Sequence, residues 1–239
     1  DPDREREVRL EAASHREACG DIEEAIAHYA HLIAGAPEDE PLTEQLSGLA
    51  ERHGRWEDVA AVFSQTITDG VAHGTKVNRM AQIARIHMQE LDAPADAVLW
   101  YERLLEIDSA HAEAFGMLAD HYRSRGLAQD EARVLAAWSG PADDDTAIAH
   151  RRRLTALHMD ELGQPERALQ LLEDDLGTTV TDEDLMARAE RLYAHFERYE
   201  DLVNLYKSAL DQDGATDEAR IELLAKLAQV AEIQLEDLD

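Results

Sequence analysis

The residues of this chain that could do chemistry are its eleven histidines and its runs of carboxylates. His28 and His31 stand three residues apart, so that both rings lie on one side of a helix, and no other two histidines share this spacing. A zinc site needs three or four ligands, and a lone pair of rings does not supply them. We therefore predict that the chain holds no metal ion.

The acidic runs do not resemble a calcium loop. Residues 38–40, 173–175 and 182–184 lack the alternating carboxylates and the central glycine of such a loop, so we interpret them as helix caps and solvated turns. The sequence has no glycine-rich phosphate loop and no nucleophile elbow, and Cys19 is its only cysteine. These observations predict a protein without a cofactor that is not an enzyme.

The net charge of −29 comes from 52 acidic and 23 basic residues. Such a chain repels phosphate groups, so we expect it to bind neither nucleic acid nor an anionic membrane surface. The acidity either serves solubility or favours a partner with a basic segment. No apolar run approaches the roughly 20 residues that span a bilayer, and we expect a cytoplasmic location. The preference for arginine over lysine is typical of a GC-rich, bacterial genome.

The one basic cluster is Arg151–Arg153. It follows the acidic run at 143–145, and we expect the two to form local charge pairs, with a contact to an acidic group of a partner as the alternative.

Three segments of the chain recur. Residues 86–92 match residues 157–163 at a distance of 71, residues 80–84 match 227–231 at 147, and residues 54–59 match 197–202 at 143. A chain that repeats itself is a stack of similar units.

The elements that carry these repeats are helices. Glycine supplies the positive φ needed at a helix end, and proline is tolerated in the first turn of the next helix, which predicts turns at Gly20, Gly54, Asp92, Gly126, Gly163 and Glu197. Apolar residues at three- and four-residue spacing mark one buried face per helix, for example Ala25, Ile26, Tyr29 and Ile33. The pattern predicts thirteen helices over residues 5–18, 22–35, 41–53, 56–69, 75–91, 94–107, 111–125, 128–139, 146–162, 165–176, 182–196, 199–212 and 217–237.

Paired helices in units of about 34 residues resemble the tetratricopeptide repeat (TPR) family. The best match is the stretch from Gly20 to Tyr29 followed by Pro37, which is similar to the turn glycine, the small alanine, the aromatic residue and the closing proline of the family. Phe115, Leu118, Ala119 and Tyr122 resemble its first-helix pattern. The units that contain Met88 and Met159 depart from it, because their first helices are one residue longer.

The resemblance implies an all-α, right-handed superhelical solenoid of antiparallel helix pairs, with six repeats and one extra helix in a single domain. The expected repeats cover residues 6–39, 40–76, 77–111, 112–147, 148–182 and 183–216, with a half-repeat at 217–239. In this family the first helices line a concave groove, which implies a protein or peptide partner. We predict that the partner contacts Asn78, Arg85, Met88, Asp120, Arg123, Arg152, Met159 and Arg191.

These features favour a protein-interaction scaffold. Two alternatives remain open: a regulatory or assembly arm of a larger multidomain enzyme, and a structural repeat that associates end to end through its last helix, at Leu235 and Leu238. The chain stops within a repeat, so we expect it to be a fragment of a longer protein.

Overall fold

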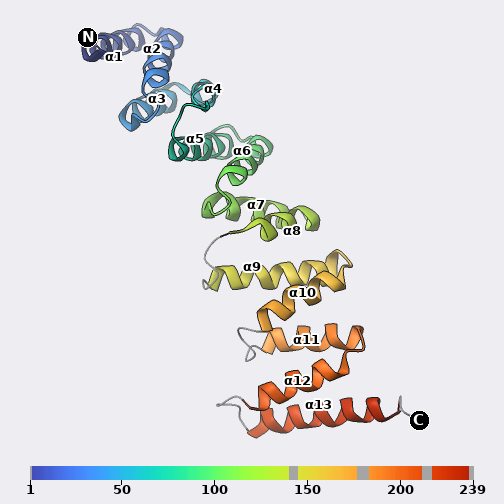
Figure 1. Cartoon of the computed structure of the whole chain (residues 1–239). Coiled ribbons are helices and arrows are strands. Elements are labelled where there is room, and N and C mark those ends of the chain that lie inside the picture. The colour runs from blue at the N-terminus through green and yellow to red at the C-terminus, as the bar shows by residue number, and fades with distance from the viewer. Residues whose placement is uncertain (1, 140–144, 177–182, 212–216, 237–239) are drawn as a thin grey trace. The chain divides into compact units, whose positions relative to one another are not determined.

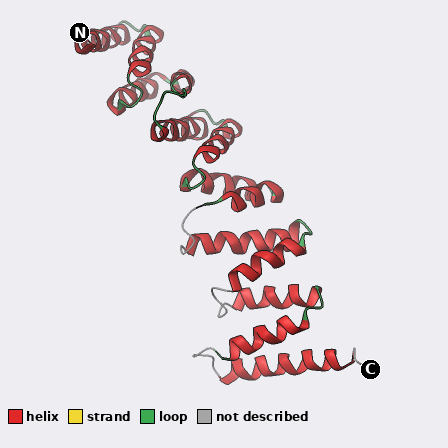
Figure 2. Ribbon diagram, in the orientation of Figure 1, coloured by secondary structure: helices red, strands yellow, loops and turns green. Residues whose placement is uncertain are grey.

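The structure is a computed structural model that describes residues 2–139, 145–176, 183–211 and 217–236. All regular structure in these ranges is helical, and no strand occurs among the described residues (Figure 2). The α-helices are α1 (Pro2–Ala18), α2 (Ile22–Gly35), α3 (Glu40–His53), α4 (Trp56–Gln65), α5 (His73–Arg85), α6 (Pro94–Ile107), α7 (Ala112–Ser124), α8 (Ala128–Ala137), α9 (Asp145–Ala156), α10 (Pro165–Leu176), α11 (Glu183–His195), α12 (Tyr199–Leu210) and α13 (Asp217–Glu236). The predicted all-α helical-repeat fold is confirmed, with thirteen α-helices among the described residues.

The helices form two compact units. Unit 1 consists of residues 1–121 with 138–140, and unit 2 of residues 122–137 with 141–239. Within each unit, a helix turns back beside the one before it, as Figure 1 shows for α1 and α2 and for α12 and α13. Consecutive helices contact one another from α1 to α6 in unit 1 and from α8 to α13 in unit 2, which is how each narrow apolar stripe is covered.

Six residues with positive φ end the first helices. Gly20, Gly54, Gly126 and Gly163 have φ between 60° and 80°, while Asp92 and Glu197 adopt the same conformation at 49° and 56°. These are the six predicted turn positions, and all six predictions are confirmed. At Asp92 and Glu197 an ordinary residue occupies a conformation that glycine adopts without strain.

Two first helices end in a π-helical turn, η1 (Ile86–Glu90) after α5 and η2 (Leu157–Glu161) after α9. A π-turn accommodates one extra residue in a helix, so the predicted one-residue extension of these two units is confirmed. Both π-turns close in the same way. The amide N–H of Ala93 donates to the carbonyl oxygen of His87 over 2.8 Å, and that of Gln164 donates to His158 over 2.8 Å.

One predicted helix is too long. The helix expected over residues 56–69 ends at Gln65, where the hydroxyl of the buried Thr66 donates to the carbonyl oxygen of Phe63 over 2.7 Å. A hydroxyl that bonds back to the helix end competes with further helical turns, which explains the earlier stop.

The core of each unit consists of these stripes. Tyr29 and Phe63 in unit 1 are 7% and 1% exposed, and Leu192 and Tyr206 in unit 2 are 1% and 4% exposed. The predicted apolar faces therefore point to the interior. In α6 this face includes the fully buried Leu104, while the neighbouring Leu105 is half-buried.

Candidate functional site

The eight predicted partner contacts lie on first helices or on the π-turns that end them. Unit 1 holds Asn78, Arg85, Met88 and Asp120, and unit 2 holds Arg123, Arg152, Met159 and Arg191. Five of these side chains are exposed, whereas Met88, Arg152 and Met159 are half-buried. A partner contact needs an exposed side chain, so the half-burial of Met88 and Met159 reduces the surface that they can offer. Met159 packs against the core of unit 2.

Arg85 is engaged by a neighbouring first helix. Its Nε donates to Oε1 of Glu113 on α7 over 2.6 Å, and a second guanidinium nitrogen contacts Oε2. The hydroxyl of Tyr101 donates to the same carboxylate over 3.2 Å. The hydrogen bond from Arg85 holds the pKa of Glu113 below its ordinary value, while burial, together with this carboxylate, raises the pKa of Tyr101 to about 12. Arg85 thus presents a guanidinium whose charge is already matched.

Arg123 takes part in a buried charge cluster in unit 2. The carboxylate of Glu131 is 1% exposed and accepts hydrogen bonds from Arg123 over 2.9 Å and from two nitrogens of Arg153 over 2.9 and 2.8 Å. Burial opposes ionisation of Glu131, but the bonds from Arg153 and Arg123 outweigh it, so its pKa stays below the ordinary value. Arg153 also pairs with Glu161 at 3.1 Å.

The basic cluster Arg151–Arg153 therefore does form charge pairs, but at Arg153 the carboxylates come from α8 and η2. The expected partners at 143–145 have side chains outside the described part of the structure.

Arg191 in unit 2 is also engaged, since it donates to Oδ1 of Asp160 over 3.0 Å. The backbone carbonyl of Arg152 accepts from Arg188 over 2.6 Å, a bond that does not involve the Arg152 guanidinium. Ion pairs with described carboxylates thus match the charge of Arg85, Arg123 and Arg191. Lys226 on α13 is also paired, with Glu190 of α11 at 2.8 Å.

A hollow of about 180 Å³ lies beside Arg85 in unit 1. It is lined by Ser47 of α3, by Trp56 and Phe63 of α4, and by Gln82, Arg85, Ile86, Gln89 and Glu90 of α5 and η1. Glu44 and Glu51 stand three residues before and four residues after Ser47, hence on the same side of α3. Neither they nor Glu90 forms an ion pair or side-chain hydrogen bond with a residue that the structure describes. Three carboxylates in or beside the hollow therefore lack a counterion among the described residues.

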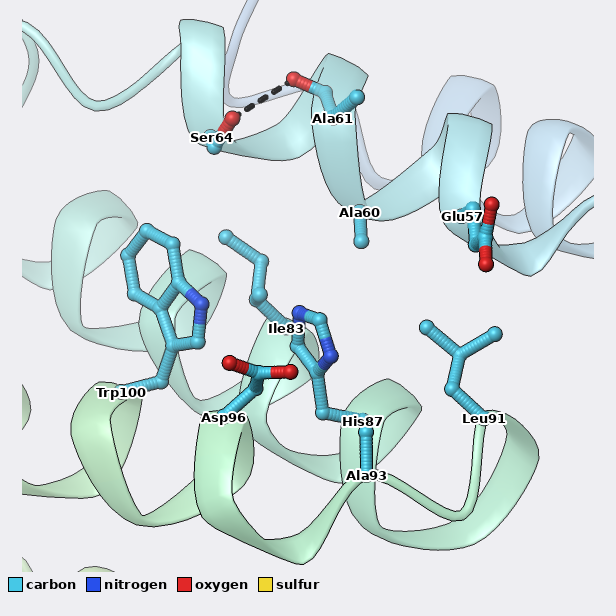
Figure 3. Close-up of a pocket in the computed structure, with 10 residues that line it drawn as sticks. All are labelled: Glu57, Ala60, Ala61, Ser64, Ile83, His87, Leu91, Ala93, Asp96 and Trp100. Atoms are coloured by element: carbon cyan, nitrogen blue, oxygen red, sulfur yellow. Dashed lines mark hydrogen bonds between the residues drawn. The ribbon is translucent and has the colours of Figure 1, made fainter.

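Sequence reasoning missed a second kind of cavity, which lies between second helices. In unit 1, a cavity of about 340 Å³ opens between α4 and α6, with η1 as its floor. Its lining consists of Glu57, Ala60, Ala61, Ser64, Ile83, His87, Leu91, Ala93, Asp96 and Trp100 (Figure 3). Figure 3 shows the His87 ring at the centre, with Trp100 on one side and Leu91 on the other. The signal that could have revealed this cavity is the recurrence of the segment around His87.

Unit 2 has a corresponding cavity of about 700 Å³ between α8 and α10, with η2 as its floor. Its lining consists of Gln129, Asp130, Ala132, Arg133, Ala136, Ala137, Leu154, His158, Leu162, Gln164, Arg167, Gln170 and Leu171. His158 is 6% exposed, and its Nδ1 lies 3.1 Å from Oε1 of Gln164. Burial lowers the pKa of His158, and the nearby Arg167 lowers it further, so this imidazole is neutral at pH 7.

The histidine pair on α2 belongs to no metal-binding group among the described residues. His28 is half-buried, and the exposed His31 has its Nε2 3.6 Å from a carboxylate oxygen of Glu5. Within the described ranges, no group of three or more histidine, cysteine or acidic side chains could hold a metal ion. None of the described helices combines the length and the apolar character that crossing a membrane requires.

No family model and no curated protein sequence matches this chain. Similar solved structures include the TPR domain of P58(IPK), at 14% identity and a TM-score of 0.35, with 96% of this chain and 66% of that chain covered. The TPR2AB domain of yeast Sti1 in a pHSP90 complex shows 12% identity and a TM-score of 0.36 over 95% of this chain and 98% of that one. A tetratricopeptide repeat protein from Parabacteroides merdae has 15% identity and a TM-score of 0.33, with 95% of this chain and 99% of that chain covered.

Scores of this size do not support a comparison of function. The description of this chain as a TPR-like helical repeat rests on its own helix pairs, on their spacing and on the six turn positions.

Proposed function

We propose that the chain is a protein-interaction scaffold without catalytic activity, and that the first helices of unit 1 bind a partner segment with a basic stretch. The ligand would lie along α3, α5 and η1, over the hollow beside Arg85. Asn78, Arg85 and Met88 are the predicted contacts in this region. Asp120 in unit 1 and Arg123, Arg152, Met159 and Arg191 in unit 2 remain predicted contacts of the same kind.

The observation that carries this proposal is the unmatched negative charge around the hollow. The predicted cation Arg85 is neutralised by Glu113, whereas Glu44, Glu51 and Glu90 have no counterion among the described residues. Glu7 on α1 is likewise exposed and without one. Electrostatic complementarity acts mainly on association rate and register, so a basic segment would associate quickly and bind less well as salt rises.

The test selects ligands without assuming their identity. Random peptides displayed on phage would be selected against the whole chain, and the binding of enriched peptides measured by fluorescence polarisation at two salt concentrations. We expect enrichment of arginine and lysine. Gln89→Trp should fill the hollow and weaken binding at least roughly tenfold, since a loss of about 1.4 kcal/mol suffices. Gln65→Trp, at an exposed position of the second helix α4, is the matched control.

Two outcomes would contradict the proposal. One is a selection that enriches no peptide above background. The other is a set of enriched peptides that bind Gln89→Trp and Gln65→Trp equally well.

A second candidate function is self-association through α13. Ile221 and Leu224 on this helix are 67% and 56% exposed, which is unusual for large apolar side chains three residues apart. The side chains of Leu235 and Leu238, which suggested this function, lie outside the described residues. Light scattering against concentration tests it: a mass that rises with concentration in the wild type and stays monomeric in Ile221→Glu would support it, and a constant mass would refute it.

A further inference from the structure

The two cavities between second helices are copies of one another. All ten lining positions of the unit 1 cavity have a counterpart in the unit 2 cavity. The counterparts of the α4 positions lie 72 residues later in the chain, and those of the remaining positions lie 71 residues later. The preserved apolar walls are Ile83 and Leu154, Leu91 and Leu162, and Ala60 and Ala132. A histidine occupies the same position of both floors.

Each cavity is tied to a π-turn. The second helix of the preceding repeat contacts η1 in unit 1 and η2 in unit 2, and the second helix of the same repeat contacts it from the other side. Single π-turns are rare in helices and frequently occur at functional sites. The inserted residue is therefore linked to a cavity of ligand size in both units.

The two copies differ in charge. The unit 1 cavity carries two carboxylates, Glu57 and Asp96, and no lysine or arginine. The unit 2 cavity has Gln129 and Arg167 at those two positions, and Arg133 where unit 1 has Ala61. Its one carboxylate, Asp130, pairs with Arg133 at 3.6 Å. The two cavities therefore offer opposite net charge to a ligand.

We propose that the unit 1 cavity receives a lysine or arginine side chain from a partner protein. Glu57 and Asp96 are exposed and form no ion pair or side-chain hydrogen bond with any described residue, so both can accept from a cation. The half-buried Leu91, next to the more deeply buried Ala60, offers apolar surface to the aliphatic stem. Trp100 adds an indole, which attracts cations and already has the guanidinium carbon of Arg103 5.0 Å from its ring centroid.

This site is separate from the hollow beside Arg85, because the two share no lining residue. The inference rests on the proposed function only in that the ligand is again a protein segment. Each site also contains its own tryptophan, Trp100 in the cavity and Trp56 in the hollow. Their indole N–H resonances report the two sites independently, and Trp138, which lines neither, serves as a reference.

The experiment titrates the whole chain with the peptide Ac-Gly-Ala-Arg-Ala-Gly-NH2 and records these three resonances. The citrulline peptide is the matched ligand, because citrulline keeps the length and hydrogen-bonding shape of arginine without its charge. We expect saturable shifts at Trp100 with arginine and roughly fivefold weaker binding with citrulline, since an exposed ion pair contributes up to about 1 kcal/mol. The Glu57→Gln/Asp96→Asn variant should lose the same factor, whereas Glu106→Gln, an exposed carboxylate elsewhere on α6, should lose nothing.

The absence of a saturable shift at Trp100 would overturn the inference. So would equal affinity for the two peptides, or an unchanged affinity of the double variant. A shift at Trp100 without one at Trp56 would leave this inference standing while the proposed groove fails, and the reverse pattern would reject the cavity and keep the groove.

Discussion

The imidazole Nδ1 of His158 is hydrogen-bonded to Oε1 of Gln164 at 3.1 Å, whereas Nδ1 of His87, at the equivalent position of unit 1, is buried without a partner among the described residues. The difference follows from one substitution, because Ala93 stands where unit 2 has Gln164. Leaving a buried polar atom unsatisfied costs roughly 1–3 kcal/mol. The duplicated segment thus contains its own comparison of a satisfied and an unsatisfied histidine.

Substituting each of these two residues by the residue of the other unit should change the free energy of unfolding in opposite directions. Gln164→Ala should lower the free energy of unfolding by about 1–2 kcal/mol, and Ala93→Gln should raise it by about 1 kcal/mol, because the amide supplies the missing partner. Urea unfolding followed by circular dichroism measures both. The gain from Ala93→Gln should disappear in a His87→Leu background, and its persistence there would show that the amide acts elsewhere.

The stability of unit 2 should depend on the protonation of His158. Burial lowers the pKa of His158 in the folded state below its ordinary value of 6.5, so the unfolded chain binds this proton more readily. The free energy of unfolding should therefore fall as pH drops below about 6.5. Glu113 and Glu131, whose pKa values are lowered, contribute stability that is lost only below about 4.5. Between pH 7.5 and 5, the urea midpoint should change less in His158→Asn than in the wild type. An equal change in the two proteins would reject this role of His158.

The sequence predicted features that depend on local chemistry. Glycine at Gly54 and Gly163 identified the turns, and the repeat then identified Glu197 and Asp92 as turns without glycine. The spacing of the repeats also predicted the extra residue that each of the π-turns η1 and η2 accommodates. Each of these features is decided within a few residues of the chain, where backbone preferences and apolar periodicity dominate.

The site was less predictable because it depends on register between helices. Arg85 and Glu113 are 28 residues apart, and only the packing of α5 near α7 brings them together. Arg85 was correctly placed on a first helix, yet its charge is matched by a residue that periodicity could not pair with it. The cavities are formed by three helices each, so the repeat shows that two equivalent places exist without showing that they are hollow.

The buried carboxylate of Glu131 should be strongly coupled to Arg153. At the equivalent positions unit 1 has Val59 and Gln82, an uncharged pair. Arg153→Gln should destabilise the chain by roughly 3 kcal/mol, because Glu131 keeps only Arg123 in an interior position. Adding Glu131→Val should restore most of that loss, with a coupling energy of about 1–3 kcal/mol in a double-mutant cycle from urea unfolding. Strict additivity would mean that the pair does not interact.

The aromatic residues of the second helices should contribute most to packing. Phe63 and Tyr101 are 1% and 2% exposed, so truncation to alanine leaves a cavity between helices. Each change should lower the free energy of unfolding by roughly 3–5 kcal/mol. Leu99→Ala, at an apolar but 54% exposed position of α6, is the control and should change it little. Melting curves of Phe63→Ala that match the wild type would contradict the burial of this ring.

The turn at Glu197 has a positive φ of 56°. Gly54, at the equivalent position of the matching segment, has a similar φ of 65°. A side chain in this left-handed conformation costs roughly 1–2 kcal/mol, while glycine loses about 0.5–1 kcal/mol more backbone entropy on folding. Glu197→Gly should therefore raise the free energy of unfolding by about 0.5–1 kcal/mol. The reciprocal change Gly54→Ala should lower it by a similar amount through backbone strain alone, since a Cβ atom at Gly54 would meet nothing within 4 Å. Urea unfolding of both variants decides the matter, because a loss of stability in Glu197→Gly would show that the glutamate side chain makes a contribution larger than the strain of its backbone.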